Sequence, residues 1–312
     1  MSDVGFSWNL IADLQQIWSF TFMQHAFEAG TMVAIIAGVM GYFVVLRRST
    51  FVAHAFSEIG FAGASGAVYV AQALSLAWLA PTDAAAYGML VGSSLGGTTI
   101  AMLSRRSSHR DVYVGIVLAF ALGIGLLFLS LYTGYATEAI SLLFGEILGI
   151  SSTDVLRTLI FGVVILVGVG VIYRPLLFSS LDEEVAEAKG LPTLFIGVAF
   201  LLLVAVAVSV AVQVTGVLLI FSLMVTPAAT AQHLASKPSR VIAISAALAL
   251  VVTWVGLFVS FYEPYPASFF ITAIVFVIYI LVRLFHHRIR TPGEHRKDWK
   301  DRVLVSTKDY SS

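Results

Sequence analysis

A histidine and a glutamate stand four positions apart in the stretch "FVAHAFSEIGFAGASGAVYV", which begins at Phe51. On a helix, His54 and Glu58 would lie on one face with their Cβ atoms about 5–6 Å apart. Imidazole nitrogen and carboxylate oxygen are both ligands for zinc and other divalent first-row metals. The pair therefore predicts a metal-contacting site. In the alternative interpretation, His54 lies at an interface and Glu58 is neutral and hydrogen-bonded to a neighbouring helix.

The same stretch contains a second pattern, Gly63-Ala64-Ser65-Gly66, which has the Gly-x-Ser-Gly form of intramembrane serine proteases. A serine nucleophile needs a base in hydrogen-bonding geometry, and only His233 offers itself at depth. Short matches of this kind are expected by chance in a chain with 25 glycines. Small residues at this density are typical of closely packed membrane helices, which is the interpretation we favour.

The elements that would position these residues are membrane helices, because the chain is 59% hydrophobic and only 12% charged. Soluble domains are about 45–50% apolar and about 25% charged. Apolar runs of spanning length recur along the whole chain. The absence of cysteine excludes disulfides, thiolate ligands and cysteine nucleophiles. The net charge of zero gives no reason to expect a nucleic-acid partner.

We predict an all-α, polytopic membrane protein with about 8–9 transmembrane helices, since helices satisfy their own backbone in lipid. Residues 1–25 form an aromatic, amphipathic lead-in on the membrane surface. Residues 26–285 form a single transmembrane domain, and 286–312 form a polar cytoplasmic tail. The nine predicted spans, each with ends placed to within three residues, are 26–46, 53–79, 84–104, 112–132, 155–173, 192–212, 214–235, 240–261 and 265–285.

Lysine and arginine fall in alternate loops, which assigns those loops and the C-terminus to the cytoplasm. Arg157 is the one basic residue on the opposite side. Glu58 is ten residues past Arg48, or about 15 Å along a helix, so it lies near the middle of the hydrocarbon layer. An ionisable residue at that depth indicates function. The residues that set this orientation are Arg47, Arg48, Arg105, Arg106, Arg110, Arg174, Lys189, Lys237, Arg240 and the basic residues from Arg283 onward.

The stretch "SSLDEEVAEAKGLP" is the one strongly charged internal segment. Ser180 and Glu183 have the spacing of a capping box, and Lys189-Gly190 closes a short cytoplasmic helix within about 180–191. Leu181 and Val185, with Ala188, give this helix one apolar stripe. We interpret the segment as a docking element for a cytoplasmic partner, with a solvated connector as the alternative.

The stretch "QVTGVLLIFSLMVTPAATAQHLA" contains Pro227, which kinks or breaks a helix inside the membrane. Kinked helices with small residues are common in transport pathways, and a simple packing kink is the alternative. Some further acidic and histidine side chains are interpreted as interfacial first and as ligands second. These are His25, Glu28, Glu138 and Glu146, while the role of His233 is left open.

No Gly-Lys dipeptide occurs anywhere in the chain, so a phosphate-binding Walker loop is absent from the sequence. No His-Glu-x-x-His motif of a membrane metalloprotease occurs either. If transport uses nucleotide energy, a partner chain must supply it.

Four stretches, in this order, resemble the membrane permease subunit of ABC-type zinc/manganese importers. They are "VVLRRSTFVAHAFSEIGFAGA", "LLFGEILGIS", "SSLDEEVAEAKGLP" and "VTGVLLIFSLMVTPAATA". The resemblance implies a fold like that of type II ABC importer permeases, a permease homodimer, cytoplasmic ABC ATPase subunits and an extracytoplasmic metal-binding protein. The family's metal-contacting pair is an Asp followed by a His, whereas this chain has His54 and then Glu58 at those positions.

The resemblance also implies roles for residues outside the metal pair. Residues expected to couple transport to the ATPase are Leu181, Asp182, Glu183, Val185, Ala186, Gly190 and Leu191. Residues expected on the pathway helix are Gly216, Pro227 and Thr230.

These observations predict a transport subunit of the cytoplasmic (inner) membrane, not an enzyme, that moves zinc or manganese, with iron as a further candidate. No permanent cofactor is expected, because the metal held by His54 and Glu58 is the cargo. The second hypothesis is a proton-coupled carrier that works through Glu58 without an ATPase. The third is an intramembrane protease with Ser65 as nucleophile.

Overall fold

The computed structural model of the chain describes residues 10–75, 80–103, 110–131, 145, 147–263 and 265–290. Over these residues the chain is helical, with turns and no strand, which confirms the predicted fold class. The helices are α1 Leu10–Trp18, α2 Thr21–Leu46, α3 Thr50–Ala73, α4 Pro81–Leu103, α5 Arg110–Leu131, α7 Ser152–Leu181, α8 Glu183–Ala188, α9 Thr193–Thr215, α10 Val217–Leu234, α11 Pro238–Tyr262 and α12 Ala267–Arg290.

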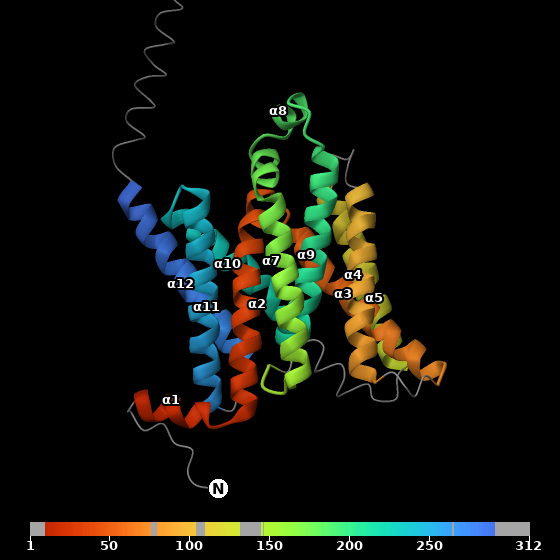
Figure 1. The fold of residues 1–312 in the computed structure, drawn as a ribbon, viewed down its shortest axis with the longest axis vertical. Helices are drawn as coiled ribbons and strands as arrows, with labels where there is room; N and C mark the ends of the chain where they lie inside the picture. The colour runs from red at the N-terminus through yellow and green to blue at the C-terminus, as the bar shows by residue number, and fades with distance from the viewer. Residues whose placement is uncertain are drawn as a thin grey trace, which may run out of the picture.

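The long helices run side by side between two ends of a bundle (Figure 1). The short α8 projects beyond one end, called here the α8 end, and α1 lies across the other, called the α1 end. Within the described residues, six helices are long and apolar enough to cross a membrane: α2, α5, α7, α9, α11 and α12. The remaining predicted spans correspond to α3, α4 and α10. These three are richer in small or polar residues or, for α10, shorter in their apolar stretch.

Small residues bring α3 and α4 into direct backbone contact. A Cβ placed on Gly63 would lie 2.3 Å from the carbonyl oxygen of Gly88, and one on Gly92 would lie 2.9 Å from the Cα of Gly63. No larger side chain fits at such a contact, which is how small residues serve membrane helices. The glycines of "GFAGASGA" therefore pack helices. The Ser65 hydroxyl donates to the carbonyl of Phe61 in its own helix, 2.9 Å away.

The central helix is α2, which packs closely against α10 and α11. A Cβ on Gly41 would lie within 1.9 Å of the Met224 carbonyl oxygen in α10. A Cβ on Gly38 would lie 2.4 Å from the Cα of Ala246 in α11, and the Gly38 carbonyl accepts a hydrogen bond from the Ser245 hydroxyl at 2.9 Å. Most residues of α2 are buried, so this helix fixes where α3 begins.

The lead-in predicted at 1–25 is divided in the structure. Its helix α1 ends at Trp18, and α2 begins at Thr21, within the range predicted for the lead-in. Ser19 closes α1 by donating its hydroxyl to the Gln16 carbonyl at 2.6 Å. Aromatic side chains surround this break, with the Trp18 and Phe27 rings 5.6 Å apart. The placement of this lead-in on a membrane surface stays a prediction.

Several predicted helix ends differ from the observed ones by more than three residues, and the end of α7 is the largest case. The span predicted at 155–173 continues as α7 to Leu181, through Pro175. Proline removes one helical hydrogen bond, and the fully buried Leu176 holds the following turns against the core. The span predicted at 214–235 agrees with α10 to within three residues, and Gly216, with a φ of +81°, forms the turn between α9 and α10.

Candidate functional site

The predicted pair lies on one face of α3, at mid-depth in the bundle. His54 and Glu58 are one turn apart in a continuous helix, as the spacing required. The depth follows from Gly60, where an added Cβ would touch Met89 and Ser93 at 3.0 and 3.7 Å. Ser93 is at the middle of α4, which runs from one end of the bundle to the other. Glu58 lies about half a turn before Gly60, in the interior of the bundle, and His54 lies one turn nearer to the start of α3.

Both side chains of the pair carry buried polar atoms without a hydrogen-bond partner among the described residues. These atoms are Nδ1 of His54 and Oε2 of Glu58, and Glu58 as a whole is only 6% exposed. Buried polar groups are normally hydrogen-bonded, and leaving one unpaired costs about 1–3 kcal/mol. Two unpaired buried atoms on one helix face each destabilise the fold. Their presence fits a site at which a ligand would bind to both atoms. The alternative in which Glu58 is hydrogen-bonded to a neighbouring helix finds no support at Oε2.

The opposite wall of the site comes from α10. The His54 imidazole packs against the Phe221 ring, with centroids 5.2 Å apart and planes inclined by 58°. Sequence reasoning missed Phe221, because one phenylalanine in an apolar helix carries no signal. Ser57, between the two candidate ligands, is not available as a third, since its hydroxyl donates to the His54 carbonyl at 2.6 Å.

The predicted pathway residues lie on or beside α10 and do not add ligands to the pair. Pro227 interrupts the hydrogen-bonding of α10 without ending it. The buried Thr230 hydroxyl donates to the Thr226 carbonyl of its own helix at 2.7 Å. Gly216 forms the turn before the helix. Their contribution is therefore the shape of α10.

Two protein ligands do not complete a metal site. In the described part of the chain, no group of three or more His, Asp or Glu side chains could hold one ion. Zinc sites in proteins use three or four protein ligands. A metal at His54 and Glu58 would therefore keep water ligands or share ligands with another chain, and it would be held weakly enough to leave.

Other titratable residues singled out in the sequence have structural partners or lie elsewhere. His25 Nδ1 lies 3.2 Å from the Ile150 carbonyl oxygen, and the His233 ring packs against Tyr279 in α12. Glu28 is exposed. The two remaining acidic candidates, Glu138 and Glu146, lie outside the described residues.

A cavity of about 230 Å³ opens near the turn between α9 and α10, away from the pair. No charged side chain lines it among the described residues, so it offers no metal site. Its wall includes Gly145, whose φ of +74° and close approach to the Thr215 backbone exclude a side chain. The lining residues are Gly145, Ile147, Leu148, Gly149, Thr215, Leu219, Pro266, Ala267 and Ser268.

The charged stretch forms α8, but its cap differs from the prediction. Ser180 is the penultimate residue of α7, so the predicted capping box of Ser180 with Glu183 is wrong. Asp182 caps α8 instead, accepting the Val185 amide at 3.0 Å. At the other end Gly190 has a φ of +77°. The Gly190 amide donates a hydrogen bond to the Glu187 carbonyl. Together with the hydrogen bond from the amide of the next residue, this forms a Schellman motif.

One side of α8 is free and the other is anchored. Leu181 and Val185 are 64% and 42% exposed, although both are large and apolar. Ala186 is fully buried, so it attaches the helix to its own chain and cannot contact a partner. A hydrogen bond of 2.7 Å from Thr193 to Glu187 adds to this attachment. Among the predicted coupling residues, Leu181 and Val185 are exposed and could contact a partner, whereas Ala186 holds α8 to its own chain.

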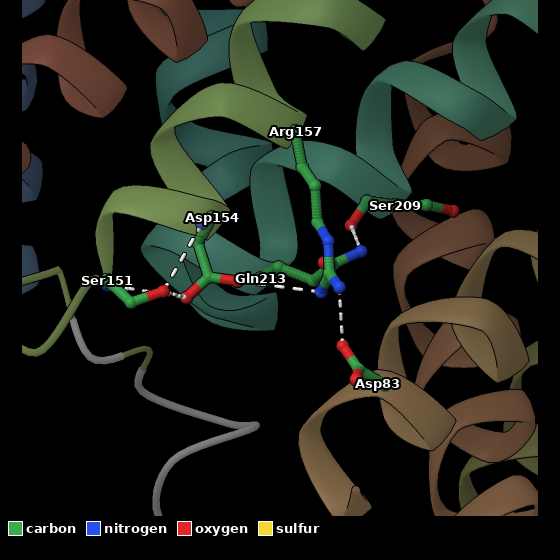
Figure 2. Close-up of polar contacts among 6 residues, drawn as sticks. All are labelled: Asp83, Ser151, Asp154, Arg157, Ser209 and Gln213. Atoms are coloured by element: carbon green, nitrogen blue, oxygen red, sulfur yellow. Dashed lines mark hydrogen bonds and ion pairs between the residues drawn. The ribbon is translucent and has the colours of Figure 1, made fainter. Parts of the chain in front are cut away.

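A second polar cluster lies toward the α1 end and explains the one basic residue on the unexpected side. Arg157 of α7 pairs with Asp83 of α4 at 2.6 Å and approaches Asp154 at 3.7 Å (Figure 2). Asp154 also belongs to the capping box that starts α7, receiving the Ser151 hydroxyl at 2.6 Å. Arg157 therefore ties the first turns of α7 and α4 together.

The family comparison covers most of the chain. The sequence model described as the ABC 3 transport family matches residues 19–286. This range contains the pair on α3, the whole of α8 and all of α10.

Individual relatives are similar over nearly their full lengths. "Manganese transport system membrane protein MntC" of Listeria monocytogenes serovar 1/2a is 27% identical over 273 residues, which are 87% of this chain and 93% of the relative. "High-affinity zinc uptake system membrane protein ZnuB" of Buchnera aphidicola subsp. Acyrthosiphon pisum is 26% identical over 242 residues, which are 77% and 88% of the two chains. Among solved structures, PsaBC from Streptococcus pneumoniae in complex with Fab superposes with a TM-score of 0.76 at 26% identity, covering 88% of this chain and 95% of that chain.

Proposed function

The chain belongs to the ABC 3 transport family, and from this premise we propose that it is the permease subunit of an ATP-binding-cassette importer for a divalent transition metal. Zinc and manganese are the cargoes named for its relatives. The observation that carries the proposal is the pair of unpartnered buried atoms, His54 Nδ1 and Glu58 Oε2, at the middle of the bundle.

The pair suits transient binding of a partly dehydrated ion. An ion crossing a low-dielectric layer loses water ligands, and protein donors must replace some of them. One imidazole and one carboxylate do so for zinc and manganese alike. Only two donors per chain keep the ion exchangeable, which a transport site needs and a structural site does not.

A homodimer would bring two such pairs together, giving up to four protein ligands. This proposal is supported by the incompleteness of the pair within one chain. The selectivity among transition metals would then depend on the spacing between two copies of His54 and Glu58. Compared with the family's Asp-then-His pair, this chain keeps one nitrogen and one carboxylate donor but reverses their order on α3, which would change the geometry of the metal site.

The α8 end is proposed to face the cytoplasm and to receive an ABC ATPase. The exposed Leu181 and Val185 supply an apolar contact on a helix that is capped at both ends. The sequence contains no Gly-Lys dipeptide and hence no Walker loop of its own. The opposite α1 end would receive an extracytoplasmic metal-binding protein.

The test is metal uptake by the chain reconstituted in vesicles with its ATPase partner. We expect radioactive manganese or zinc to accumulate only when ATP is present on the α8 side. Val185→Asp should prevent ATPase binding, whereas Glu184→Gln, an exposed change on the same helix, should not. Uptake without the ATPase, driven by a proton gradient, would support a secondary carrier and contradict the proposal.

A further inference from the structure

Arg47 at the end of α2 binds the part of α7 that leads into α8. Its Nη1 atom donates to the hydroxyls of Ser179 and Ser180, both at 3.3 Å. Ser179 and Ser180 lie two residues and one residue before the end of α7. Asp182, the N-cap residue of α8, follows directly after α7. The guanidinium is therefore attached to the base of α8.

The same guanidinium also contacts the helix that follows α8. It lies over the Phe200 ring of α9, with Cζ 5.6 Å from the ring centroid. A cation this close to an aromatic face is attracted to it. A Cβ placed on Gly197, one turn earlier in α9, would lie 3.6 Å from Nη2 of Arg47. Arg47 thus contacts both helices that flank α8.

The segment around α8 is attached to both flanking helices. The Lys189 ammonium lies 5.1 Å from the Phe178 ring centroid, which ties the end of α8 back to α7. Thr193 donates to Glu187 at 2.7 Å, which ties α8 to the start of α9. Because Ala186 is fully buried as well, a force on the exposed side of α8 reaches the ends of α7 and α9 together.

On its other side, Arg47 is joined to α3 by a short, closed turn. Arg48 has a φ of +51°, and the Ser49 amide donates to the Val44 carbonyl at 2.9 Å. The buried Ser49 also donates its hydroxyl to the Arg47 carbonyl at 3.2 Å. The turn contains only residues 47–49, and His54 follows within the first two turns of α3. A displacement of Arg47 therefore displaces the start of the helix that carries the pair.

We propose that Arg47 is the positioning residue through which movement of α8 reaches His54 and Glu58. The inference rests on the proposed role of α8 in coupling to an ATPase. A guanidinium suits the task, because its planar, multi-donor head holds two hydroxyls and a ring in one fixed arrangement, which an ammonium cannot do. Coupling between distant sites can be carried by packed side chains and hydrogen bonds of this kind.

The neighbouring arginine provides a matched control. Arg47→Gln and Arg48→Gln each remove one positive charge from the same turn, but Arg48 is exposed. We expect the Arg47→Gln complex to bind its ATPase and hydrolyse ATP at the parental rate, with metal imported per ATP reduced about ten-fold, within the usual range of coupling between sites. Arg48→Gln should retain the parental ratio. Arg47→Lys should be intermediate.

A second measurement separates positioning from simple stability. In the parental complex, Mn²⁺ affinity should differ with and without a non-hydrolysable ATP analogue, and Arg47→Gln should abolish that difference while leaving the nucleotide-free affinity unchanged. If Arg47→Gln does not assemble, the paired change Ser179→Ala with Ser180→Ala must give the same loss.

The outcomes are distinguishable from those of the proposed function. A parental import ratio in Arg47→Gln, or in the double serine variant, would overturn the role of Arg47 and leave the importer proposal standing. An equal loss in Arg48→Gln would also overturn it, since charge alone would then be responsible. If the parental complex itself shows no ATP-driven import, the proposed function fails, and the link fails with it.

Discussion

Two of the polar clusters in the described part of this apolar bundle differ in whether their atoms have partners. Toward the α1 end, Arg157 is paired with Asp83 at 2.6 Å and lies 3.7 Å from Asp154. On α3, His54 Nδ1 and Glu58 Oε2 are buried without a hydrogen-bond partner in the described structure. The first cluster is a third exposed, whereas Glu58 is 6% exposed. The polar atoms without a hydrogen-bond partner thus lie in the more buried cluster, where an unpaired polar group destabilises the fold more.

We proposed that the α3 cluster serves transport, and the difference agrees with a first cluster that serves only the fold. A paired charge near water costs little and stabilises little. An unpaired polar group in the interior costs stability, and replacing it by an apolar group would be neutral or favourable. Such a pair persists for another reason, and a dehydrated metal ion that needs a nitrogen and an oxygen donor supplies one.

The largest expected effect is loss of transport at the unpartnered cluster. Glu58→Gln keeps the shape and removes the charge, and His54→Ala removes the nitrogen donor. Each should reduce uptake of radioactive zinc or manganese to background in vesicles, while the protein still reaches the membrane. Glu28→Gln, at an exposed glutamate of α2, is the control and should transport normally. Parental uptake in both α3 variants would show that the pair is not the metal site.

The next effect is a dependence of metal affinity on pH. Metal binds neutral imidazole and ionised carboxylate, so protons compete with it, and affinity should fall as the pH is lowered. Each group that must release a proton weakens binding by up to about ten-fold per pH unit below its pKa. Calorimetric titration of Mn²⁺ into the parental complex over a pH series measures this slope. His54→Ala should flatten it in the range where histidine titrates, and an unchanged slope would contradict ligation by His54.

The sequence predicted the helices because their signal is repeated along the chain. Apolar runs and alternating basic loops placed every predicted span on an observed helix, and the family match confirms the resemblance found in four short stretches. Helix ends were less accessible. The span predicted to end at residue 173 continues as α7 to Leu181, and the sequence alone does not show this because the burial of Leu176 depends on neighbours that are remote in sequence. Gly216 was placed inside a span, since only backbone geometry distinguishes a turn glycine from a packing one.

The sequence predicted only those residues of the candidate site whose type and spacing are themselves unusual in a membrane helix. His54 and Glu58 are conspicuous because ionisable residues are rare in such a chain. Phe221 was not, since its role depends on α10 lying against α3. Arg47 was read only as an orientation signal, although its contacts with Ser179 join segments 132 residues apart. Contacts between remote helices are a property of packing, which no local pattern records.

A smaller effect, on stability, would sharpen the contrast between the clusters. Glu58→Met replaces an unsatisfied carboxyl by an apolar group of similar length. The free energy of unfolding should stay constant or rise by about 1–3 kcal/mol, because a buried group without a partner is removed. Thermal unfolding of the detergent-solubilised protein measures this, with Glu28→Met as the exposed control. A clear fall for Glu58→Met alone would mean that the carboxylate is stabilised by the fold after all.

The smallest effect is expected at the paired cluster. Arg157→Gln and Asp83→Asn should each lower the free energy of unfolding by about 0.2–1 kcal/mol, as for other partly exposed ion pairs. The double variant should lose less than the sum of the two, since the pair is already broken by the first change. Unfolding midpoints of the four proteins give this coupling energy directly. Raising the salt concentration should shrink it, because about a third of each side chain meets solvent.

Transport is the measurement that decides whether the paired cluster is only structural. Arg157 and Asp83 join α7 to α4 at the end of the bundle opposite α8. If this end stays closed throughout the cycle, both single variants should import metal at the parental rate. If instead α7 and α4 separate when the α1 end opens, breaking the pair should speed opening and raise import or leak. A change in the import rate of either variant would therefore show that the paired cluster also takes part in transport. It would contradict the assignment of a purely structural role to Arg157 and Asp83.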